Sequence, residues 1–184
     1  MRMGRTVPEG ALAERVEALR AEALACIHPA FIWRRFPICG GTVASGGLQL
    51  KIAGTLARHL TGCGAVYLAC GTIGAAFDAF QRRASVSSGA DALIVQAIGA
   101  ALVEKLMDQA EDSIRGDLAG GETPVPRYSP GYGDFPLDAQ RAILELLDAP
   151  RRVGVSLTGS LLLAPAKSVS AVIGVKGGTS TSPA

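Results

Sequence analysis

The segment AVYLACGTIG, from Ala65 to Gly74, is a nearly continuous apolar run that ends in glycine. Such a run predicts a buried strand that leads into a turn. Upstream of it, LQLKI (Leu48 to Ile52) alternates apolar and polar residues and predicts another strand. GTLARHLTGC, between the two, predicts a short helix. This strand–helix–strand order predicts a sheet that is covered by helices on at least one face.

Two longer helices are predicted from apolar periodicity. The first runs from Pro8 to Ala25, and HPAFIWRRFPI (His28 to Ile38) breaks it and gathers aromatic residues, which suggests a segment docked on the core. The longest helix runs from about Ala90 to Ile114. Its expected apolar stripe comprises Leu93, Ile94, Ile98, Leu102 and Leu106. A patch of small residues, where another backbone can approach closely, comprises Ala97, Ala100 and Ala101.

The carboxy-terminal third predicts a further helix and two strands. Asp134 is expected to cap this helix, Pro136 to lie in its first turn and Pro150 to stop it. Its expected buried face comprises Leu137, Ile143, Leu144 and Leu147. RVGVSLT and SVSAVIGV predict the strands. The polar tail, residues 177–184, is expected to be disordered.

Composition narrows the class of protein. A chain of 184 residues that is 48 % hydrophobic can build one domain with a real core. A net charge of +2 with scattered Lys and Arg does not favour nucleic acid as a partner. No apolar run approaches the roughly 20 residues that span a bilayer, and the amino end lacks an apolar signal region, so we expect a cytoplasmic protein.

The four cysteines do not predict a metal site. No CxxC pair occurs, and the two histidines lie near no such pair, so we expect no bound zinc. The better interpretation is buried, reduced thiols at Cys26, Cys39, Cys63 and Cys70.

One stretch is built for binding rather than for core packing. In RYSPGYGDFP (Arg127 to Pro136), Pro130 fixes φ and Gly131 permits the positive φ of a type II turn. Arg127 and Tyr132 flank this elbow, the first suited to a carboxylate and the second to a cation or an adenine-like ring. An alternative from the residue types alone is a structural loop whose arginine pairs with a nearby acid.

The order of motifs around this elbow resembles the activation domain of cobalamin-dependent methionine synthase. The family pattern is an arginine, two variable residues, Pro-Gly-Tyr and a further proline, then a helix, an LT-S segment, a proline and an SVS strand. The matching residues are Arg127, Pro130-Gly131-Tyr132, Pro136, Leu157-Thr158, Ser160, Pro165 and Ser168-Val169-Ser170. ALVEKLMDQAE (Ala101 to Glu111) and LACGTIGAAFD (Leu68 to Asp78) also fit the family.

The resemblance implies an α+β fold, with a bent, mostly antiparallel sheet flanked by helices. It places an amino-terminal helix and docking segment in residues 1–40, the activation-domain-like core in residues 41–176, and the tail in residues 177–184. The implied function is a stand-alone reactivation module that binds S-adenosylmethionine for reductive remethylation of cob(II)alamin. The cobalamin would be held by a partner, which is methionine synthase or another corrinoid protein, and flavodoxin or another reductant would supply the electron.

The resemblance also assigns roles to residues, none of them catalytic, because positioning is the main task. Arg127 would pair with the methionyl carboxylate and Tyr132 would line the groove near the sulfonium. Ser129, Pro130 and Gly131 form the elbow, whose backbone would contact the ligand. Glu104 could hold the amino group. It shares a helix face with Asp108 and Glu111, so a solvated acidic stripe explains Glu104 equally well.

A second hypothesis is a non-catalytic scaffold or binding module for a corrinoid protein that has lost S-adenosylmethionine binding. The chain has no convincing counterpart of the family's amino-terminal aspartate motif, and Ala171, Val172 and Ile173 stand where the full-length enzyme carries aromatic residues. A third hypothesis is a stable α/β domain with an unrelated role.

Overall fold

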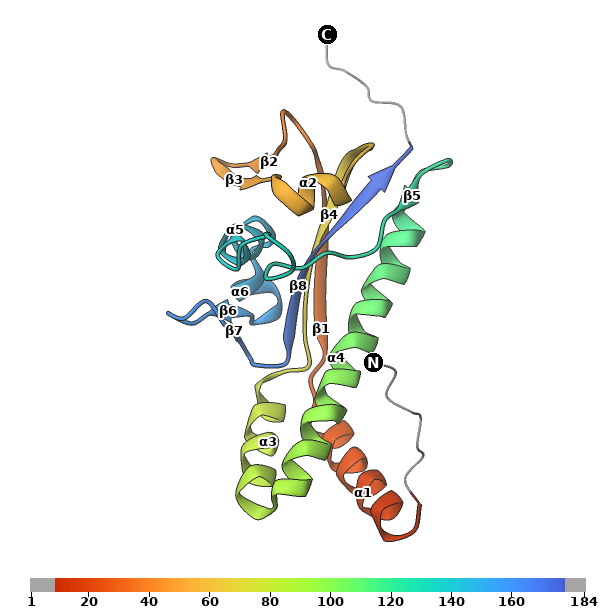
Figure 1. Cartoon of the computed structure of the whole chain (residues 1–184), viewed down its shortest axis with the longest axis vertical. Coiled ribbons are helices and arrows are strands. Elements are labelled where there is room, and N and C mark those ends of the chain that lie inside the picture. Colours follow the sequence, from red (N-terminus) through yellow and green to blue (C-terminus); the bar gives the residue numbers. More distant parts are fainter. Residues whose placement is uncertain (1–8, 178–184) are drawn as a thin grey trace.

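The computed structural model describes residues 9–177 and is organised around a four-stranded antiparallel sheet (Figure 1). The strand order is β1-β4-β8-β5. The bounds are Ala30–Pro37 for β1, Cys63–Thr72 for β4, Ser168–Lys176 for β8 and Thr123–Pro124 for β5. The aromatic segment expected to dock on the core is thus strand β1, which pairs with β4 along its whole length.

Strand β4 is buried on both faces, which explains its unbroken apolar sequence. Alternate residues point to opposite sides. Val66, Leu68 and Cys70 belong to one hydrophobic cluster, and Tyr67 and Ala69 belong to another. The predicted buried strand is confirmed, and the sheet carries packed layers on both of its faces.

One face of the sheet is covered by a layer of three helices, one of which is the longest helix of the described residues. They are α1 (Ala11–Cys26), α3 (Ala75–Ser87) and α4 (Gly89–Asp117). In Figure 1, α4 runs along the sheet, and α1 and α3 pack beside its amino-terminal half. The Ser88 hydroxyl caps α4 by accepting a hydrogen bond from the Asp91 backbone N–H at 3.4 Å.

The buried side of α4 differs in part from the predicted stripe. Leu106 is buried, but Leu93 is 74 % exposed, because the core-facing side of the first turns is formed by Val95 and Gly99. The patch of small residues at Ala97, Ala100 and Ala101 is also exposed, so no backbone packs on it. The close approach occurs at Gly99 instead, where an added Cβ would lie 2.4 Å from Cε1 of Phe77.

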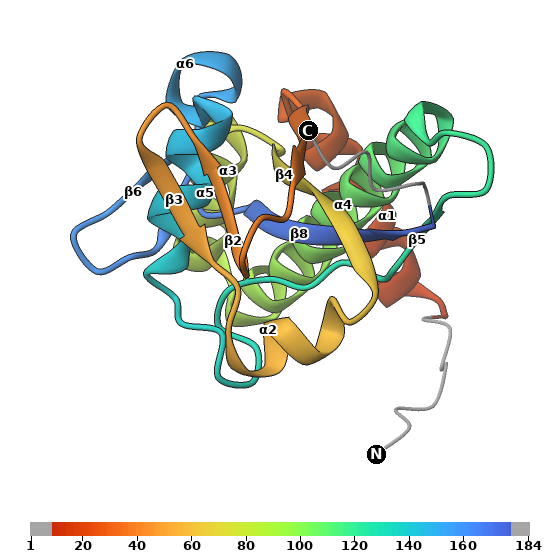
Figure 2. The same cartoon turned by 90° about the horizontal axis from the view of Figure 1, so that it is seen from above.

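The opposite layer is made of short elements. They are β2 (Thr42–Ser45), β3 (Leu48–Lys51), α2 (Gly54–His59), α5 (Ala139–Leu147), α6 (Ala149–Val153), β6 (Ser156–Leu157) and β7 (Leu163–Ala164). In Figure 1 this layer lies to the left of β8 and α4 lies to its right, and Figure 2 shows the same elements from above. The strand predicted at residues 48–52 is confirmed as β3, although it pairs with β2 in a separate hairpin rather than with the central sheet.

Three details of the predicted carboxy-terminal third are corrected. Helix α5 begins only at Ala139, and Leu137, expected to be buried, is 38 % exposed. Pro150 lies in the first turn of α6, after α5 has already ended at Leu147. The strand predicted at residues 152–158 shrinks to Ser156–Leu157, because residues 149–153 are helical.

The fold class is the predicted one, an antiparallel sheet flanked by helices. Strand β8 was predicted by SVSAVIGV and pairs with β4 over most of its length. The predicted tail lies, apart from Gly177, outside the described residues. Among residues 9–177, no helix is long and apolar enough to cross a membrane.

Candidate functional site

The elbow at residues 129–132 has the predicted turn geometry. The Tyr132 N–H donates to the Ser129 carbonyl at 3.3 Å, which closes a four-residue turn. Gly131 has a φ of 94°, as the third position of a type II turn requires. Pro130 occupies the second position, where its ring restricts φ to negative values. The Gly131 N–H donates to the Phe135 carbonyl at 2.8 Å, which braces the turn from its carboxy-terminal side.

Tyr128 fixes the elbow to the sheet. Its N–H donates to the Val172 carbonyl at 2.8 Å, and its carbonyl accepts from the Val172 N–H at 2.9 Å. Its ring stacks on His59 with ring centroids 4.9 Å apart, and its hydroxyl donates to the Tyr132 carbonyl at 3.2 Å. The elbow is therefore tied to β8 by backbone bonds and to α2 by side-chain packing.

Arg127 is held by carboxylates of α4. Its Nη2 donates to Glu104 at 2.5 Å, and its Nη1 donates to Asp108 at 2.9 Å and also to Glu111. Burial opposes the charged guanidinium, but the hydrogen bonds to Glu111, Asp108 and Glu104 outweigh it and raise the pKa of Arg127. The alternative in which the arginine pairs with a nearby acid is therefore observed, whereas the carboxylates of α4 are paired with Arg127 rather than forming a stripe that only solvent contacts.

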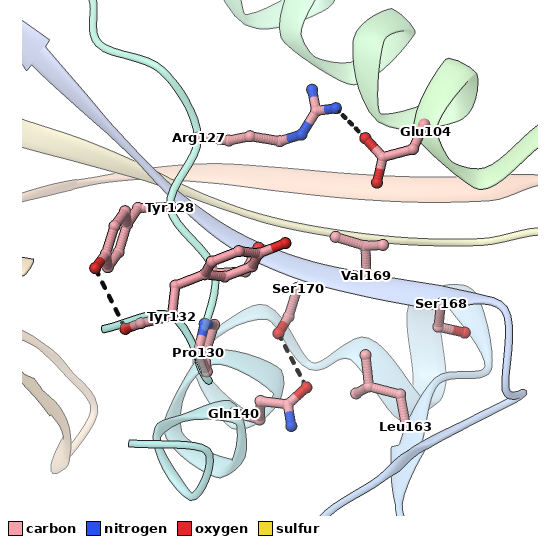
Figure 3. Close-up of a pocket in the computed structure, with 11 residues that line it drawn as sticks. Glu104, Arg127, Tyr128, Pro130, Tyr132, Gln140, Leu163, Ser168, Val169 and Ser170 are labelled. Atoms are coloured by element: carbon pink, nitrogen blue, oxygen red, sulfur yellow. Dashed lines mark hydrogen bonds and ion pairs between the residues drawn. The ribbon is translucent and has the colours of Figure 1, made fainter. Parts of the chain in front are cut away.

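A pocket of about 430 Å³ lies beside the elbow. Figure 3 shows Arg127 and Glu104 facing each other on one side of it, Tyr132 and Pro130 on another, and Val169 of β8 between them. The lining residues are Glu104, Arg127, Tyr128, Ser129, Pro130, Tyr132, Gln140, Leu163, Ser168, Val169 and Ser170. Its volume falls in the range of roughly 300–1,000 Å³ that is usual for small-molecule sites.

The structure brings most of the predicted site residues together. Glu104, Arg127, Ser129, Pro130 and Tyr132 all line the pocket, and Gly131 shapes the turn without lining it. Several lining residues were not predicted from the sequence, namely Tyr128, Gln140, Leu163, Ser168, Val169 and Ser170. The SVS motif was a signal for the last three. Nothing local to Gln140 or Leu163 marks them, because they reach the pocket through tertiary packing.

The charges and donors around the pocket define what it can bind. Three hydrogen bonds occupy three of the five guanidinium N–H groups of Arg127, and the Nε–H has no partner among the described residues. Free donors therefore remain for a carboxylate. The single charge of Arg127 faces three carboxylates, which favours a cationic group nearby, and the Tyr132 side chain is exposed enough to offer its ring face.

Comparisons with known proteins bear on the family and the fold of the chain. Residues 90–179 match the family described as vitamin B12 dependent methionine synthase, activation domain. The fold is similar to that in a crystal structure of the MetH reactivation domain bound to AdoHcy, with a TM-score of 0.54 and 18 % identity. The alignment covers 90 % of this chain and 67 % of that one. No curated protein matches the sequence.

The matched segment contains the whole pocket lining, from Glu104 on α4 to Ser170 on β8. The fold is that of a methionine synthase activation domain. Residues 90–179 belong to the activation-domain family of vitamin B12-dependent methionine synthase, as the motifs predicted.

Proposed function

We propose that the chain binds S-adenosylmethionine in the Arg127–Tyr132 pocket and presents its methyl group to a corrinoid held by another protein. The observation that carries the proposal is the placement of a guanidinium and an exposed phenol ring beside one pocket of about 430 Å³, within the segment that matches the family. The similar MetH domain was crystallised with AdoHcy, the demethylated form of this ligand.

Each group of the ligand has a matching side chain. The free N–H groups of Arg127 suit the methionyl carboxylate, and Glu104, which is half-exposed on α4, suits the amino group. The Tyr132 ring suits the sulfonium, because a cation is attracted to the face of an aromatic ring. The backbone of Ser129 and Pro130 at the elbow contacts the remainder of the ligand.

The task of these residues is positioning. S-adenosylmethionine supplies the methyl group that restores a reduced corrinoid, and the chain holds that group in a fixed orientation. The elbow suits this task, because backbone bonds to Val172 and the Tyr128–His59 stack immobilise it. The corrinoid protein and a reductant such as flavodoxin act as partners of this module in the cytoplasm.

Calorimetric titration with S-adenosylmethionine tests the proposal. Wild type should bind, Arg127→Gln should weaken binding about tenfold or more through loss of a charge-assisted pair, and Tyr132→Ala should weaken it severalfold. Arg151→Gln is the matched control, because Arg151 is 85 % exposed and does not line the pocket. Thermal unfolding of each variant separates lost binding from lost folding. An absence of binding by correctly folded wild type would overturn the proposal.

A second candidate is a scaffold for a corrinoid protein that no longer binds S-adenosylmethionine. The three carboxylates on Arg127 favour it, because they already neutralise the guanidinium that a methionyl carboxylate needs. Binding of a methionine synthase fragment that carries cobalamin, with equal affinity in the presence and absence of S-adenosylmethionine, would support the scaffold. Affinity that rises when S-adenosylmethionine is added would favour the reactivation module.

A further inference from the structure

Gln140 is a buried polar residue that joins three segments of the pocket wall. It lies on α5, its side chain lines the pocket, and it is only 6 % exposed. Its Nε2 donates to the Leu161 carbonyl at 2.9 Å. Its Oε1 accepts from the Ser170 hydroxyl at 3.4 Å, a bond that Figure 3 shows. One amide therefore links α5 to the β6–β7 loop and to strand β8.

The β6–β7 loop contains a residue in an unfavourable backbone conformation. Leu161 has a φ of 63°, in the left-handed region that costs a residue with a Cβ roughly 1–2 kcal/mol. The loop has bonds of its own, because the Leu161 N–H donates to the Thr158 carbonyl at 3.0 Å and the Thr158 N–H to the Leu162 carbonyl at 2.9 Å. These bonds close the loop on itself without tying its tip to the core.

The bond from Gln140 supplies that tie. Among residues 9–177, Gln140 is the residue outside the β6–β7 loop whose side chain hydrogen-bonds to residues 158–162. The other side-chain hydrogen bonds of these residues form within the loop. Leu162, the last residue before β7, is 60 % exposed, so burial of its side chain contributes little to holding the loop. Leu163 follows directly and forms part of the pocket wall. The position of that wall therefore depends on the conformation that Gln140 stabilises at Leu161.

Helical packing alone does not account for a glutamine at this position. The other buried residues of α5 are Ile143, Leu144, Leu146 and Leu147, and an apolar side chain of similar volume would pack at position 140 equally well. Burying an amide costs free energy unless its polar atoms find partners. Gln140 finds them in the β6–β7 loop and in strand β8, which is the arrangement expected of a residue that orients a binding site.

We propose that Gln140 is a positioning residue: its amide holds Leu161 in the left-handed conformation and so sets the Leu163 wall of the pocket. The effect on ligand binding rests on the proposed function, because it assumes that S-adenosylmethionine is the ligand. The effect of Gln140 on the conformation of the β6–β7 loop does not depend on the proposed function. Gln140 acts here through Leu161 rather than by contact with the ligand.

The test uses two substitutions separately and together. Gln140→Met removes the amide and nearly conserves volume, and Leu161→Gly permits a positive φ without steric cost. We expect Gln140→Met to speed hydrogen exchange of the Leu161 and Leu162 N–H groups and to weaken S-adenosylmethionine binding, each about fivefold, as expected for one hydrogen bond. Adding Leu161→Gly should restore the affinity in part. Gln49→Met, at an exposed position of β3, is the control.

Each outcome decides the proposal. Unchanged exchange in Gln140→Met would overturn it, because the amide would then not hold the loop. Faster exchange with weaker binding that Leu161→Gly fails to restore would also overturn it, because Gln140 would then act by direct contact with the ligand. If wild type does not bind S-adenosylmethionine, the proposed function fails, and the exchange rates still decide whether Gln140 positions the loop.

Discussion

The Asp134 carboxylate accepts hydrogen bonds from both the backbone N–H and the hydroxyl of Thr55, a residue 79 positions earlier in the chain. The N–H lies 2.6 Å from Oδ1 and belongs to the first turn of α2. Asp134 therefore satisfies a free donor at the amino end of α2 and, in the same contact, anchors the segment that follows the elbow. The hydrogen bond from the Thr55 hydroxyl, together with that from its N–H, lowers the pKa of Asp134.

The first prediction concerns this anchor. Asp134→Ala should lower the melting temperature at neutral pH, because it leaves the Thr55 donors without their acceptor. Asp138→Ala is the matched control, since Asp138 precedes α5 without making a side-chain cap. Thermal unfolding, followed by circular dichroism at several pH values, measures the melting temperatures of wild type and of both variants.

The pH dependence of this effect has a definite sign. The folded-state pKa of Asp134 lies below the unfolded value of about 3.9, so its contribution is fully present above that value. The contribution is lost as pH falls through the lower, folded-state pKa. The melting temperatures of wild type and Asp134→Ala should therefore converge in acid. A difference that grows in acid would contradict the assignment.

Asp134 also shows where local sequence patterns fail. The sequence placed it as the cap of the following helix, because an acid shortly before an apolar repeat is the usual signal. The partner it takes is on α2, and no pattern within a few residues reveals such a contact. Strands β4 and β8 were predicted because each is buried along a run of consecutive residues, which shows in the sequence as a mostly apolar segment. Helix α3 was missed, because only Phe77, Phe80 and Ala84 mark its buried side.

The candidate site likewise contains residues that a local sequence motif predicts and contacts that only tertiary packing determines. Arg127 and Tyr132 were predicted because the Pro-Gly elbow between them is a local motif with a fixed geometry. That Arg127 binds Asp108 and Glu111 as well as Glu104 depends on how the elbow segment lies across α4, which the sequence does not specify. Gln140 enters the pocket only because β8 and the β6–β7 loop pack against α5.

The second prediction concerns the contact between α3 and α4. Alanine favours helix over glycine, yet Gly99→Ala should destabilise the fold by about 1–3 kcal/mol, because the new Cβ would overlap the Phe77 ring. Gly116→Ala is the control in the same helix, since its Cβ would meet nothing within 4 Å. That substitution should be neutral or stabilising by about 0.5 kcal/mol. Urea denaturation measures both, and a stabilising Gly99→Ala would show that α3 and α4 pack less closely.

The third prediction follows from the excess of carboxylates around Arg127. Glu104, Asp108 and Glu111 outnumber Arg127 and Arg115, which also pairs with Glu111, so a sulfonium should bind better than the neutral thioether of the demethylated product. We expect S-adenosylmethionine to bind about fivefold more tightly than S-adenosylhomocysteine at low salt. The preference should shrink as ionic strength rises from about 0.01 M to about 1 M, because the Debye length falls from about 30 Å to about 3 Å.

Competition calorimetry with the two ligands measures this ratio. Asp108→Asn should reduce it, because Asp108 is one of the three acids and does not itself line the pocket. Asp112→Asn is the control on the same helix, since Asp112 pairs with Arg115 rather than with Arg127. Equal affinities for the two ligands at low salt would show that the carboxylates do not act on the sulfonium.

The last prediction concerns the thiols. Cys70 lies near the carboxy-terminal end of β4 with no exposed surface, and burial raises the pKa of its thiol to about 12. Because the thiolate is the reactive form, Cys70 should resist alkylation in the folded protein. Cys39 is exposed in the turn that precedes β2 and should react first. Iodoacetamide labelling at about pH 8, near the ordinary thiol pKa, followed by peptide mass spectrometry, compares the two sites. Labelling of Cys70 should appear only when denaturant opens the sheet, so its rate reports separation of β4 from its neighbours, and equal labelling of both thiols without denaturant would place Cys70 outside the core.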